Sequence, residues 1–475
     1  MDKWIHFIGI AGVTTAGLAK AFKDQGFFVT GSDKGFYSPV KDFLEKNGIE
    51  ISLGYKPERL ELNGMHPGIV VVQGTKGDKN PEYIRARELN LNIKTYPEIL
   101  KDYCVLHDSS IVIAGSYGKS TITAILVNIF KANNTPISYM FGGFDMYLND
   151  NVKFKDHFSK YSVIEGDEYL TSFENTQSKF FYYSPKYLII NGIEWDHQDL
   201  FPTFESYLNN FKKLVDSVPE DGLIVANHDN ENVREILSNA KAKVVFCSSK
   251  FSFEKDINWK VITDSNPKKV LFRQGDQLKD NLMIPFKENI VGEFNNINIL
   301  LASAMAFELG VTQDSIQTGI ESYMGLKRRL EVKYVQNDNY IIDDFGSTVG
   351  KAKFALEAVQ RDFPEHHIHL IFDPSSGARS RISLNEYNKV FESVHPTIEL
   401  LKFSLLPNKD NQKFSEDEFA SKIESFGIKV NRYETDSQAL ESLKKIFKEE
   451  KKVILFLGSH SFRGMISNLI KLLED

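Results

Sequence analysis

The chain has 475 residues, 42% hydrophobic and 25% charged, and this length exceeds what one hydrophobic core usually supports, so we expect about three domains. The net charge of -7 and the lack of a basic stripe argue against a nucleic-acid partner, and the lack of a long apolar run or a leader pattern argues against a membrane. The two cysteines, Cys104 and Cys247, show neither metal-ligand nor disulfide spacing, which predicts a reducing cytoplasm.

The first hundred residues alternate short apolar runs with helical patterns, which indicates parallel strands joined by helices. A new apolar strand starts at Ile111 after a polar stretch, so we place the first domain boundary after residue 107. Strands are predicted at 5–12, 27–33, 49–54, 69–74 and 92–96, and helices at 14–26 and 80–90.

Gly9, Gly12 and Gly17 follow the first strand and open a helix, and Asp33 ends the next strand. This spacing is close to a dinucleotide-binding fingerprint, in which a diphosphate lies on the helix N-terminus. On these residues alone, NAD and a UDP-sugar are equally good ligands. Thr75, at a later strand end, is either a further member of the same site or an ordinary turn residue.

The stretch 111–130 reads IVIAGSYGKSTITAILVNIF, which is an apolar strand, a small-residue turn and a helix. Glycines let successive N–H groups face an anion, and the helix N-terminus adds a positive dipole end. Lys119 is placed to reach the outer phosphates, and Ser120 to offer an oxygen to Mg²⁺. The alternative is a plain strand-to-helix turn. The motif predicts a nucleotide triphosphate site made of Gly115, Ser116, Gly118, Lys119, Ser120 and Thr121.

Two later strands end in groups that could bind a metal. Glu165 ends one apolar strand, and Asp196, His197 and Asp199 follow the next. Because the carboxyl ends of parallel strands line the ligand crevice, these side chains are expected to face the phosphate loop. Mg²⁺ prefers oxygen ligands to an imidazole, and each residue could also be a charged residue at a loop start. Further strands are predicted at 221–227 and 243–249, and a helix at 294–310.

A basic cluster, Lys327, Arg328 and Arg329, precedes a predicted hairpin at 331–346. The remainder again alternates helices with strands, of which 368–376 and 453–459 are the clearest. We therefore predict an α/β protein with three domains, at 1–107, 108–326 and 327–475.

Several motifs follow one another in an order that resembles the Mur ligases, which build the peptide stem of the bacterial cell wall. The resemblance covers the chain end to end, and residues 165–201 are most similar to the branch that acts on UDP-N-acetylmuramate. Members of that branch join this substrate to a stem peptide or to L-alanine. The motifs are GSYGKST at 115–121, Glu165, DHQD at 196–199, GEFNNIN at 292–298, GLKRRLE at 325–331 and IIDDFG at 341–346.

The resemblance implies a Rossmann-like N-terminal domain, a central P-loop ATPase-type domain with a mostly parallel sheet, and a Rossmann-like C-terminal domain. It implies an ATP-dependent ligase that turns a carboxylate into an acyl phosphate, with two Mg²⁺ ions. Lys119 would stabilise the transferring phosphoryl group, Ser120 and Glu165 would bind one ion, and His197 would help to bind the second. The nucleotide would contact Asn295, Asn298, Arg329 and Asp344, the UDP-sugar would contact Gly9, Gly12, Asp33 and Thr75, and Lys327 and Arg328 would be solvated.

The chain departs from the family pattern mainly in the C-terminal domain, which holds the incoming amine. The usual His-His-Pro is replaced by Ser347, Thr348 and Val349, and an arginine is missing from FDPSS at 372–376. These changes suggest a different amino acid or peptide, whose carboxylate Arg379 and Arg381 could bind, unless both lie in a solvated loop. A ligase with another acceptor, such as a folate, and a non-catalytic nucleotide-binding protein are the alternatives.

Three further departures concern the central domain. Gly192 stands where an asparagine is usual, and Phe294 stands where a histidine is usual. No lysine of this chain matches the carbamylated lysine that some relatives place beside the second metal.

Overall fold

The protein is described by a computed structural model in which the chain divides into two compact units. One unit is Met1–Phe286 with Asn295–Met324, and the other is Lys287–Phe294 with Gly325–Asp475. Within the described part of the chain, no helix combines the length and the apolar character needed to cross a membrane. The structure describes residues 3–73, 79–146, 148, 150–195, 197, 200–250, 257–262, 268–274, 277–284, 292–403, 413–458 and 461–474.

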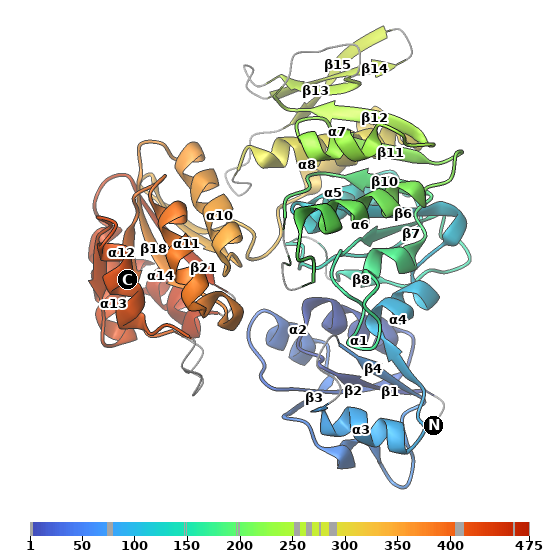
Figure 1. Ribbon diagram of the computed structural model, residues 1–475, viewed down its shortest axis with the longest axis horizontal. Helices are drawn as coiled ribbons and strands as arrows, with labels where there is room; N and C mark the ends of the chain where they lie inside the picture. Colours follow the sequence, from blue (N-terminus) through green and yellow to red (C-terminus); the bar gives the residue numbers. More distant parts are fainter. Residues whose placement is uncertain are drawn as a thin grey trace. The chain divides into compact units, whose positions relative to one another are not determined.

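A five-stranded parallel sheet in the order β3-β2-β1-β4-β5 forms the first part of the larger unit. This is the doubly wound order, in which β1 and β4 meet at the point where the strand sequence reverses. The helices α1, α2 and α4 lie on one face and α3 on the other (Figure 1). Its elements are β1 (Trp4–Ile8), α1 (Val13–Asp24), β2 (Phe28–Asp33), α2 (Val40–Lys46), β3 (Glu50–Leu53), β4 (Ile69–Val72), α3 (Pro81–Glu88), β5 (Ile93–Thr95) and α4 (Tyr96–Tyr103).

A ten-stranded sheet in the order β15-β14-β13-β12-β11-β10-β6-β9-β7-β8 forms the rest of this unit. Its central strands are parallel and completely apolar over several residues, as expected for strands covered on both faces. The edge strands β13 to β15 pair antiparallel.

The bounds of its strands are β6 (Ser110–Ala114), β7 (Ile137–Met140), β8 (Val152–Lys153), β9 (Tyr161–Glu165), β10 (Tyr187–Ile190), β11 (Leu223–Asn227), β12 (Lys243–Ser248), β13 (Trp259–Ile262), β14 (Lys268–Gln274) and β15 (Gln277–Ile284). Its helices are α5 (Lys119–Ala132), α6 (Phe204–Asp216), α7 (Glu231–Leu237), α8 (Phe294–Glu308) and α9 (Gln313–Ser322).

Successive side chains of β6 point to opposite faces of the sheet, and each face is covered by different helices. Val112 and Ala114 join a core cluster with residues of α6 and α7, which Figure 1 shows on one face of the sheet. The helix α5 lies on the other face and packs closely against α9, since a Cβ at Gly319 would meet the Ile129 backbone. The same core cluster continues into α1 and α4, so the two sheets of this unit share one core.

The smaller unit is built on a six-stranded sheet in the order β16-β17-β21-β18-β19-β20. The first two strands form the predicted antiparallel hairpin, and the other pairings are parallel. One core cluster lies under α10 to α12 and another under α13 and α14. The elements are β16 (Glu331–Gln336), β17 (Asn339–Asp344), α10 (Val349–Asp362), β18 (His367–Asp373), α11 (Arg381–Phe391), β19 (Thr397–Leu400), α12 (Glu416–Glu424), β20 (Val430–Arg432), α13 (Asp436–Ile446), β21 (Lys452–Gly458) and α14 (Met465–Glu474).

The α/β class with mostly parallel sheets is confirmed, and each strand and helix named from the sequence is present. No sequence pattern had indicated α2, α4, α6, α7, α9, β7, β8 or the antiparallel strands β13 to β15. The domain boundaries at 107 and 326 stay predictions.

Candidate active site at the phosphate loop

The strand β6 lies between β9 and β10, and this order places three loops at one edge of the sheet. Ala114 pairs with Ile190, and Ile113 pairs with Glu165, so the three strands end at the same level. The phosphate loop, the turn that begins at Glu165 and the loop that begins at Asn191 therefore leave the sheet side by side. This juxtaposition confirms the expectation that the ends of these strands share one edge.

The phosphate loop is a short turn between β6 and α5. Gly115 has φ of 132° and Gly118 has φ of 80°, which are values that favour glycine. Gly118 is the N-cap of α5, and the apolar residues of that helix are buried against the sheet. The N–H groups of the first turn, at Lys119, Ser120 and Thr121, have no intrahelical partner, so the loop and the helix N-terminus can bind an anion.

The Lys119 ammonium is buried beside several carboxylates. Its Nζ donates to Glu168 Oε2 at 2.9 Å and also to the carbonyl of Gly115. Burial lowers the pKa of Lys119, but the nearby charges of Glu168, Asp167 and Glu165 outweigh it and raise that pKa above its usual value. The lysine is therefore charged at any physiological pH and available to a phosphate oxygen.

Glu168 forms an ion pair with the lysine at 2.9 Å, and it was not among the site residues expected from the sequence. Its side chain is only 1% exposed, accepts a hydrogen bond from the Tyr207 hydroxyl at 3.3 Å, and lies 3.7 Å from His197 Nε2. The clue that the sequence offered was the run of acidic residues EGDE at 165–168, directly after an apolar strand.

Three side chains could hold a metal ion together. Ligand atoms of Asp167, Glu168 and His197 all lie within 4.8 Å of one another. Two carboxylates and one imidazole are an oxygen-rich set that fits Mg²⁺. Of the residues expected to bind metal, His197 belongs to this set, whereas the Glu165 carboxylate accepts a hydrogen bond from Gly142 N at 2.6 Å.

Asp167 has a second lysine beside it, which was not expected from the sequence. Lys179, 7% exposed, donates to the Asp167 carboxylate and lies 5.4 Å from the centre of the Tyr169 ring. Burial raises the pKa of Asp167, but Lys179 and Lys119 outweigh it and lower that pKa to about 2. The carboxylate is thus ionised at working pH.

Asn298 belongs to a buried chain of amides behind the phosphate loop. Asn191 Nδ2 donates to Asn298 Oδ1 at 3.0 Å, Asn227 Nδ2 donates to Asn191 Oδ1 at 3.0 Å, and Asn298 Nδ2 donates to Asn295 Oδ1 at 3.1 Å. A Cβ at Gly118 would meet the amides of Asn191 and Asn298, so these hydrogen-bonded asparagines pack directly against the turn of the phosphate loop. The expected contact of Asn295 and Asn298 with adenine stays a prediction.

Two of the candidate UDP-sugar residues, Gly9 and Gly12, follow β1 at the switch point of the first sheet. Gly9 follows β1 with φ of 89°, and Gly12 is the N-cap of α1. A Cβ at either position would crowd Gln73. Asp33 accepts from Ala11 N at 2.8 Å and from Lys34 N at 2.7 Å, and burial raises its pKa.

Thr75 and Gly17 complete this set of predictions. Thr75 lies outside the described residues. Gly17 lies inside α1, where a Cβ would meet the side chains of Asn151 and Val152. Its lack of a side chain therefore permits close packing between the first sheet's helix and β8.

The basic cluster of the smaller unit is arranged differently from the expectation. Arg328 is not solvated: it is 8% exposed, its Nε lies 3.2 Å from Asp343 Oδ2, and its Nη2 donates to the Gly458 carbonyl at 2.6 Å. Arg329 is exposed, as Lys327 is. These residues lie in the turn before β16, and Arg328, with φ of 58°, is buried there through its contacts with Asp343 and Gly458.

Asp344 ends β17 with its carboxylate held by the backbone. It accepts hydrogen bonds from Leu330 N at 2.8 Å and Gly346 N at 2.7 Å, and burial raises its pKa. The predicted contacts of Arg329 with a γ-phosphate and of Asp344 with a ribose stay predictions.

The candidate amine-site arginines follow β18. Arg379 is 2% exposed and its guanidinium lies 5.1 Å from the centre of the Phe403 ring, so it does not lie in a solvated loop. Arg381 is the first residue of α11. At the position of the missing histidines, the carbonyl of Ser347 accepts from Ser375 N at 3.0 Å.

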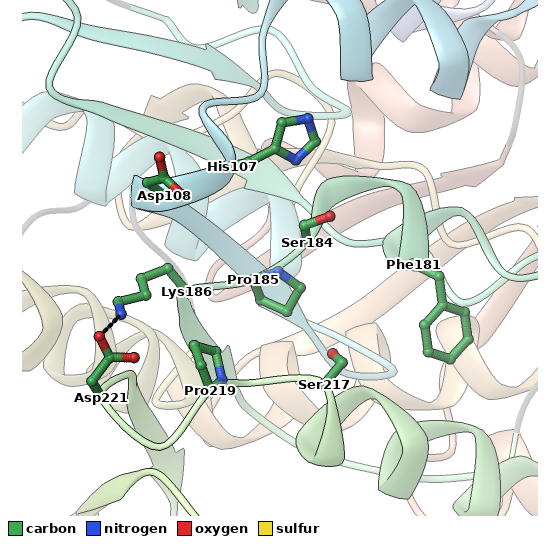
Figure 2. A pocket seen from close by; sticks show the side chains of 9 residues that line it. All are labelled: His107, Asp108, Phe181, Ser184, Pro185, Lys186, Ser217, Pro219 and Asp221. Atoms are coloured by element: carbon green, nitrogen blue, oxygen red, sulfur yellow. Dashed lines mark ion pairs between the residues drawn. The ribbon is translucent and has the colours of Figure 1, made fainter.

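A pocket of about 440 Å³ lies at the amino-terminal ends of the central strands of the large sheet (Figure 2). Its lining comes from residues just before β6, β10 and β11, including the ion pair of Lys186 with Asp221. Because the phosphate loop leaves the other ends of these strands, this pocket is separate from the candidate active site.

Comparison with known proteins agrees with the motif order. Residues 4–105 match the Mur ligase catalytic domain, and residues 113–306 match the Mur ligase middle domain. The UDP-N-acetylmuramate–L-alanine ligase of Clostridium acetobutylicum is 31% identical over 431 residues, which are 90% of this chain and 89% of that protein. The chain belongs to the Mur ligase family.

A second relative of this Mur ligase carries a different substrate in its name. The UDP-N-acetylmuramate–L-alanyl-γ-D-glutamyl-meso-2,6-diaminoheptandioate ligase of Haemophilus influenzae is 32% identical over 346 residues, which are 72% of this chain and 73% of that protein. The two identities are nearly equal, so they do not separate the two substrates.

Solved structures share the fold. The murein peptide ligase of Psychrobacter arcticus matches with a TM-score of 0.71 and 21% identity, and covers 99% of both chains. The UDP-N-acetylmuramate–alanine ligase of Thermotoga maritima matches with a TM-score of 0.73 and 20% identity, again over 99% of both chains.

Proposed function

We propose that this Mur ligase is an ATP-dependent enzyme that joins the carboxylate of UDP-N-acetylmuramate to the amine of a stem peptide, as in murein tripeptide recycling. The observation that carries the proposal is the phosphate loop whose Lys119 contacts Glu168 at 2.9 Å, beside Asp167 and His197. A lysine and a metal-binding set at one anion site are what phosphoryl transfer requires.

The phosphate of ATP serves to activate an inert acid. An oxygen of the substrate carboxylate attacks the γ-phosphorus, the bond to the β-phosphate oxygen breaks, and ADP leaves. The amine nitrogen then attacks the acyl carbon, inorganic phosphate leaves with the former carboxylate oxygen, and the nitrogen loses a proton. The protein mainly has to position the partners and neutralise charge.

Each residue of the site has a role in this scheme. The Lys119 ammonium offsets the negative charge that develops on the transferring phosphoryl group, and the loop N–H groups hold the phosphates. Asp167, Glu168, His197 and Ser120 would hold Mg²⁺, with Glu165 as a further candidate, and bound Mg²⁺ would neutralise the phosphate oxygens. Two ions are proposed by analogy with the family.

The amine substrate has two candidates. The similarity of residues 165–201 and of GLKRRLEV to peptide-ligating members favours a stem peptide. L-Alanine is the second candidate, because the relative from Clostridium acetobutylicum that matches 90% of the chain is named for it. A non-catalytic nucleotide-binding role is the alternative of another class.

The test is to incubate the protein with UDP-N-acetylmuramate, ATP and Mg²⁺, to offer single amino acids and stem peptides in turn, and to measure product masses. We expect a condensed product with the tripeptide and ADP release only when both co-substrates are present. Product with L-alanine instead would select the second candidate, and no product with any amine would contradict the proposal.

Lys119→Ala should lower turnover by about 100-fold or more, because the site loses the cation that stabilises the phosphoryl group. Lys131→Ala is the matched control, since Lys131 lies at the far end of the same helix and donates to the Tyr139 hydroxyl instead. Intact turnover in Lys119→Ala would rule out this mechanism.

A further inference from the structure

The Tyr117 ring packs directly against Gly192 in the loops at the carboxyl ends of the central strands of the large sheet. A Cβ built at Gly192 would overlap the hydroxyl oxygen and the Cζ atom of the Tyr117 ring. Gly192 is not among the glycines with positive φ, so its backbone would accept an alanine. A side chain at position 192 would therefore require the Tyr117 ring to move.

The same two loops are tied by hydrogen bonds. Ser116 N donates to the Gly192 carbonyl at 2.7 Å, Ser116 Oγ donates to the Glu194 carbonyl at 2.8 Å, and Glu194 N donates to Ser116 Oγ at 2.9 Å. The Tyr117 hydroxyl donates to Glu194 Oε1 at 3.4 Å and also contacts Asn230, the N-cap of α7. The tyrosine thus adds a packed ring to a set of backbone contacts.

The tied loop is the one that leads to His197. Only a few residues separate Glu194 from His197, whose imidazole lies 3.7 Å from Glu168. On the other side, Tyr117 is two residues before Lys119, which contacts the same Glu168 at 2.9 Å. A shift between the two loops would therefore change the distance between the lysine and the metal-binding set.

We propose that Tyr117 is a positioning residue, whose ring, seated against Gly192, fixes the phosphate loop to the loop that carries His197. The inference rests on the proposed function, because it assigns a role in MgATP binding and turnover to a residue that the activity does not otherwise require. Burial and Glu194 raise the pKa of Tyr117 to about 12, so its hydroxyl keeps its proton to donate.

The test is a double-mutant cycle with Gly192→Ala, Tyr117→Ala and the double variant. Displacing the ring should weaken MgATP binding and lower kcat, so we expect Gly192→Ala to raise the calorimetric Kd for MgATP and to reduce kcat by about tenfold or more. In the Tyr117→Ala background the same glycine substitution should change either value by less than about twofold, since the clash is gone. KM for UDP-N-acetylmuramate should stay unchanged.

Gly350→Ala is the matched control, because a Cβ at Gly350 meets no atom within 4 Å and its φ is not positive. Equal effects of Gly192→Ala in both backgrounds, or no effect of Tyr117→Ala on kcat and on the Kd for MgATP, would overturn the proposal. If Gly192→Ala fails to fold, Tyr117→Ala and the double variant still decide it, because both lack the clash and Tyr117→Ala alone must weaken MgATP binding.

The two proposals can fail separately. If the wild-type protein binds MgATP but forms no amide, the proposed function fails while the Kd values of the cycle still test the tyrosine. If the amide forms and the cycle is additive, only the positioning role of Tyr117 fails.

Discussion

The turn after β9 shows that the carboxylate at the end of a strand is not always the one that contacts the phosphate-loop lysine. Glu165 is the last residue of the strand, yet its carboxylate accepts from Gly142 N, and Glu168, three residues later, contacts Lys119 and lies near His197. The backbone reversal after the strand, and not the alternation within it, decides which carboxylate reaches the lysine.

The two glutamates give a direct test of the site. Glu168→Gln should reduce kcat by about 100-fold and raise the Mg²⁺ concentration needed for half-maximal rate, because the site loses one charge next to the lysine and the imidazole. Glu165→Gln keeps an oxygen that can accept from Gly142 N and should have the smaller effect. Steady-state rates over a Mg²⁺ series would check both, and a larger effect at Glu165 would favour the original assignment.

The pair of Lys179 with Asp167 predicts a pH dependence of stability. The pKa of Asp167 falls from 3.8 to about 2 in the folded protein, so the ionised carboxylate stabilises the fold above 3.8 and this contribution is lost as pH falls toward 2. Lys179→Met removes the main attraction that lowers this pKa. The difference in free energy of unfolding between wild type and variant should therefore be largest at pH values above 3.8, the ordinary pKa of Asp167, and should shrink at lower pH.

Urea unfolding at a series of pH values measures that difference. Lys186→Met is the matched control, because its partner Asp221 is 82% exposed and an exposed ion pair contributes little. A difference for Lys179→Met that does not change with pH would mean that the lysine stabilises the fold by packing alone.

At the scale of elements, the loop after β10 carries most of the chemistry on its side of the site. It begins with Asn191 in the amide network, continues through Gly192 and Glu194 against the phosphate loop, and reaches His197. Trp195 lies in the same loop with 42% of its surface exposed, and its Nε1 donates to the Phe201 carbonyl at 2.9 Å. An exposed indole in the loop that contacts the phosphate loop is a natural reporter of ligand binding.

Trp195 should therefore report ligand binding by fluorescence. The chain has three tryptophans, and the other two, Trp4 and Trp259, are at most 2% exposed. Adding MgATP should change the emission of the wild-type protein, and Trp195→Phe should abolish the change, whereas Trp4→Phe should not. A change that persists in Trp195→Phe would place the reporter elsewhere.

At the scale of the whole molecule, the first two sheets behave as one unit. Phe22 of α1 is fully buried and meets Tyr103 and Phe154 with ring centres 4.8 Å apart in each pair. Asn151 Nδ2 also donates to the Val13 carbonyl at 3.3 Å. These contacts join α1 of the first sheet to the segment that follows β7, so the phosphate loop and the candidate UDP-sugar residues belong to one folded body.

This shared core predicts cooperative unfolding of the larger unit. Phe22→Ala should lower its free energy of unfolding by about 3–5 kcal/mol, the usual effect of removing a buried phenyl ring. Because Trp4 lies in the first sheet and Trp259 in the second, their emission in single-tryptophan variants should change at the same denaturant concentration.

Phe158→Ala serves as the control, since Phe158 is 66% exposed and its loss should change the unfolding midpoint little. Loss of the Trp4 signal well before the Trp259 signal would show that the two sheets unfold independently.

The amino-acid sequence by itself determined those features of the protein that depend on the pattern of neighbouring residues. The alternation of apolar runs and helices gave the α/β class, and the small residues and lysine at 115–121 gave the phosphate loop, because backbone conformation at such positions follows from local residue type. Motif order gave the family. The residues at the ends of β9 and β10 were expected at one edge of a parallel sheet, and the structure placed both strands beside β6.

Tertiary structure decided which side chains meet. The contact of Glu168 rather than Glu165 with Lys119 and the packing of Tyr117 against Gly192 each join residues that follow different strands. The pairing of Lys179 with Asp167 joins two residues of the connection between β9 and β10. Arg328, expected in solvent, is buried because the turn before β16 brings its guanidinium to Asp343 of β17. Such pairings depend on how loops reverse and pack, which is set by contacts between distant segments, and a local sequence pattern holds no record of those contacts.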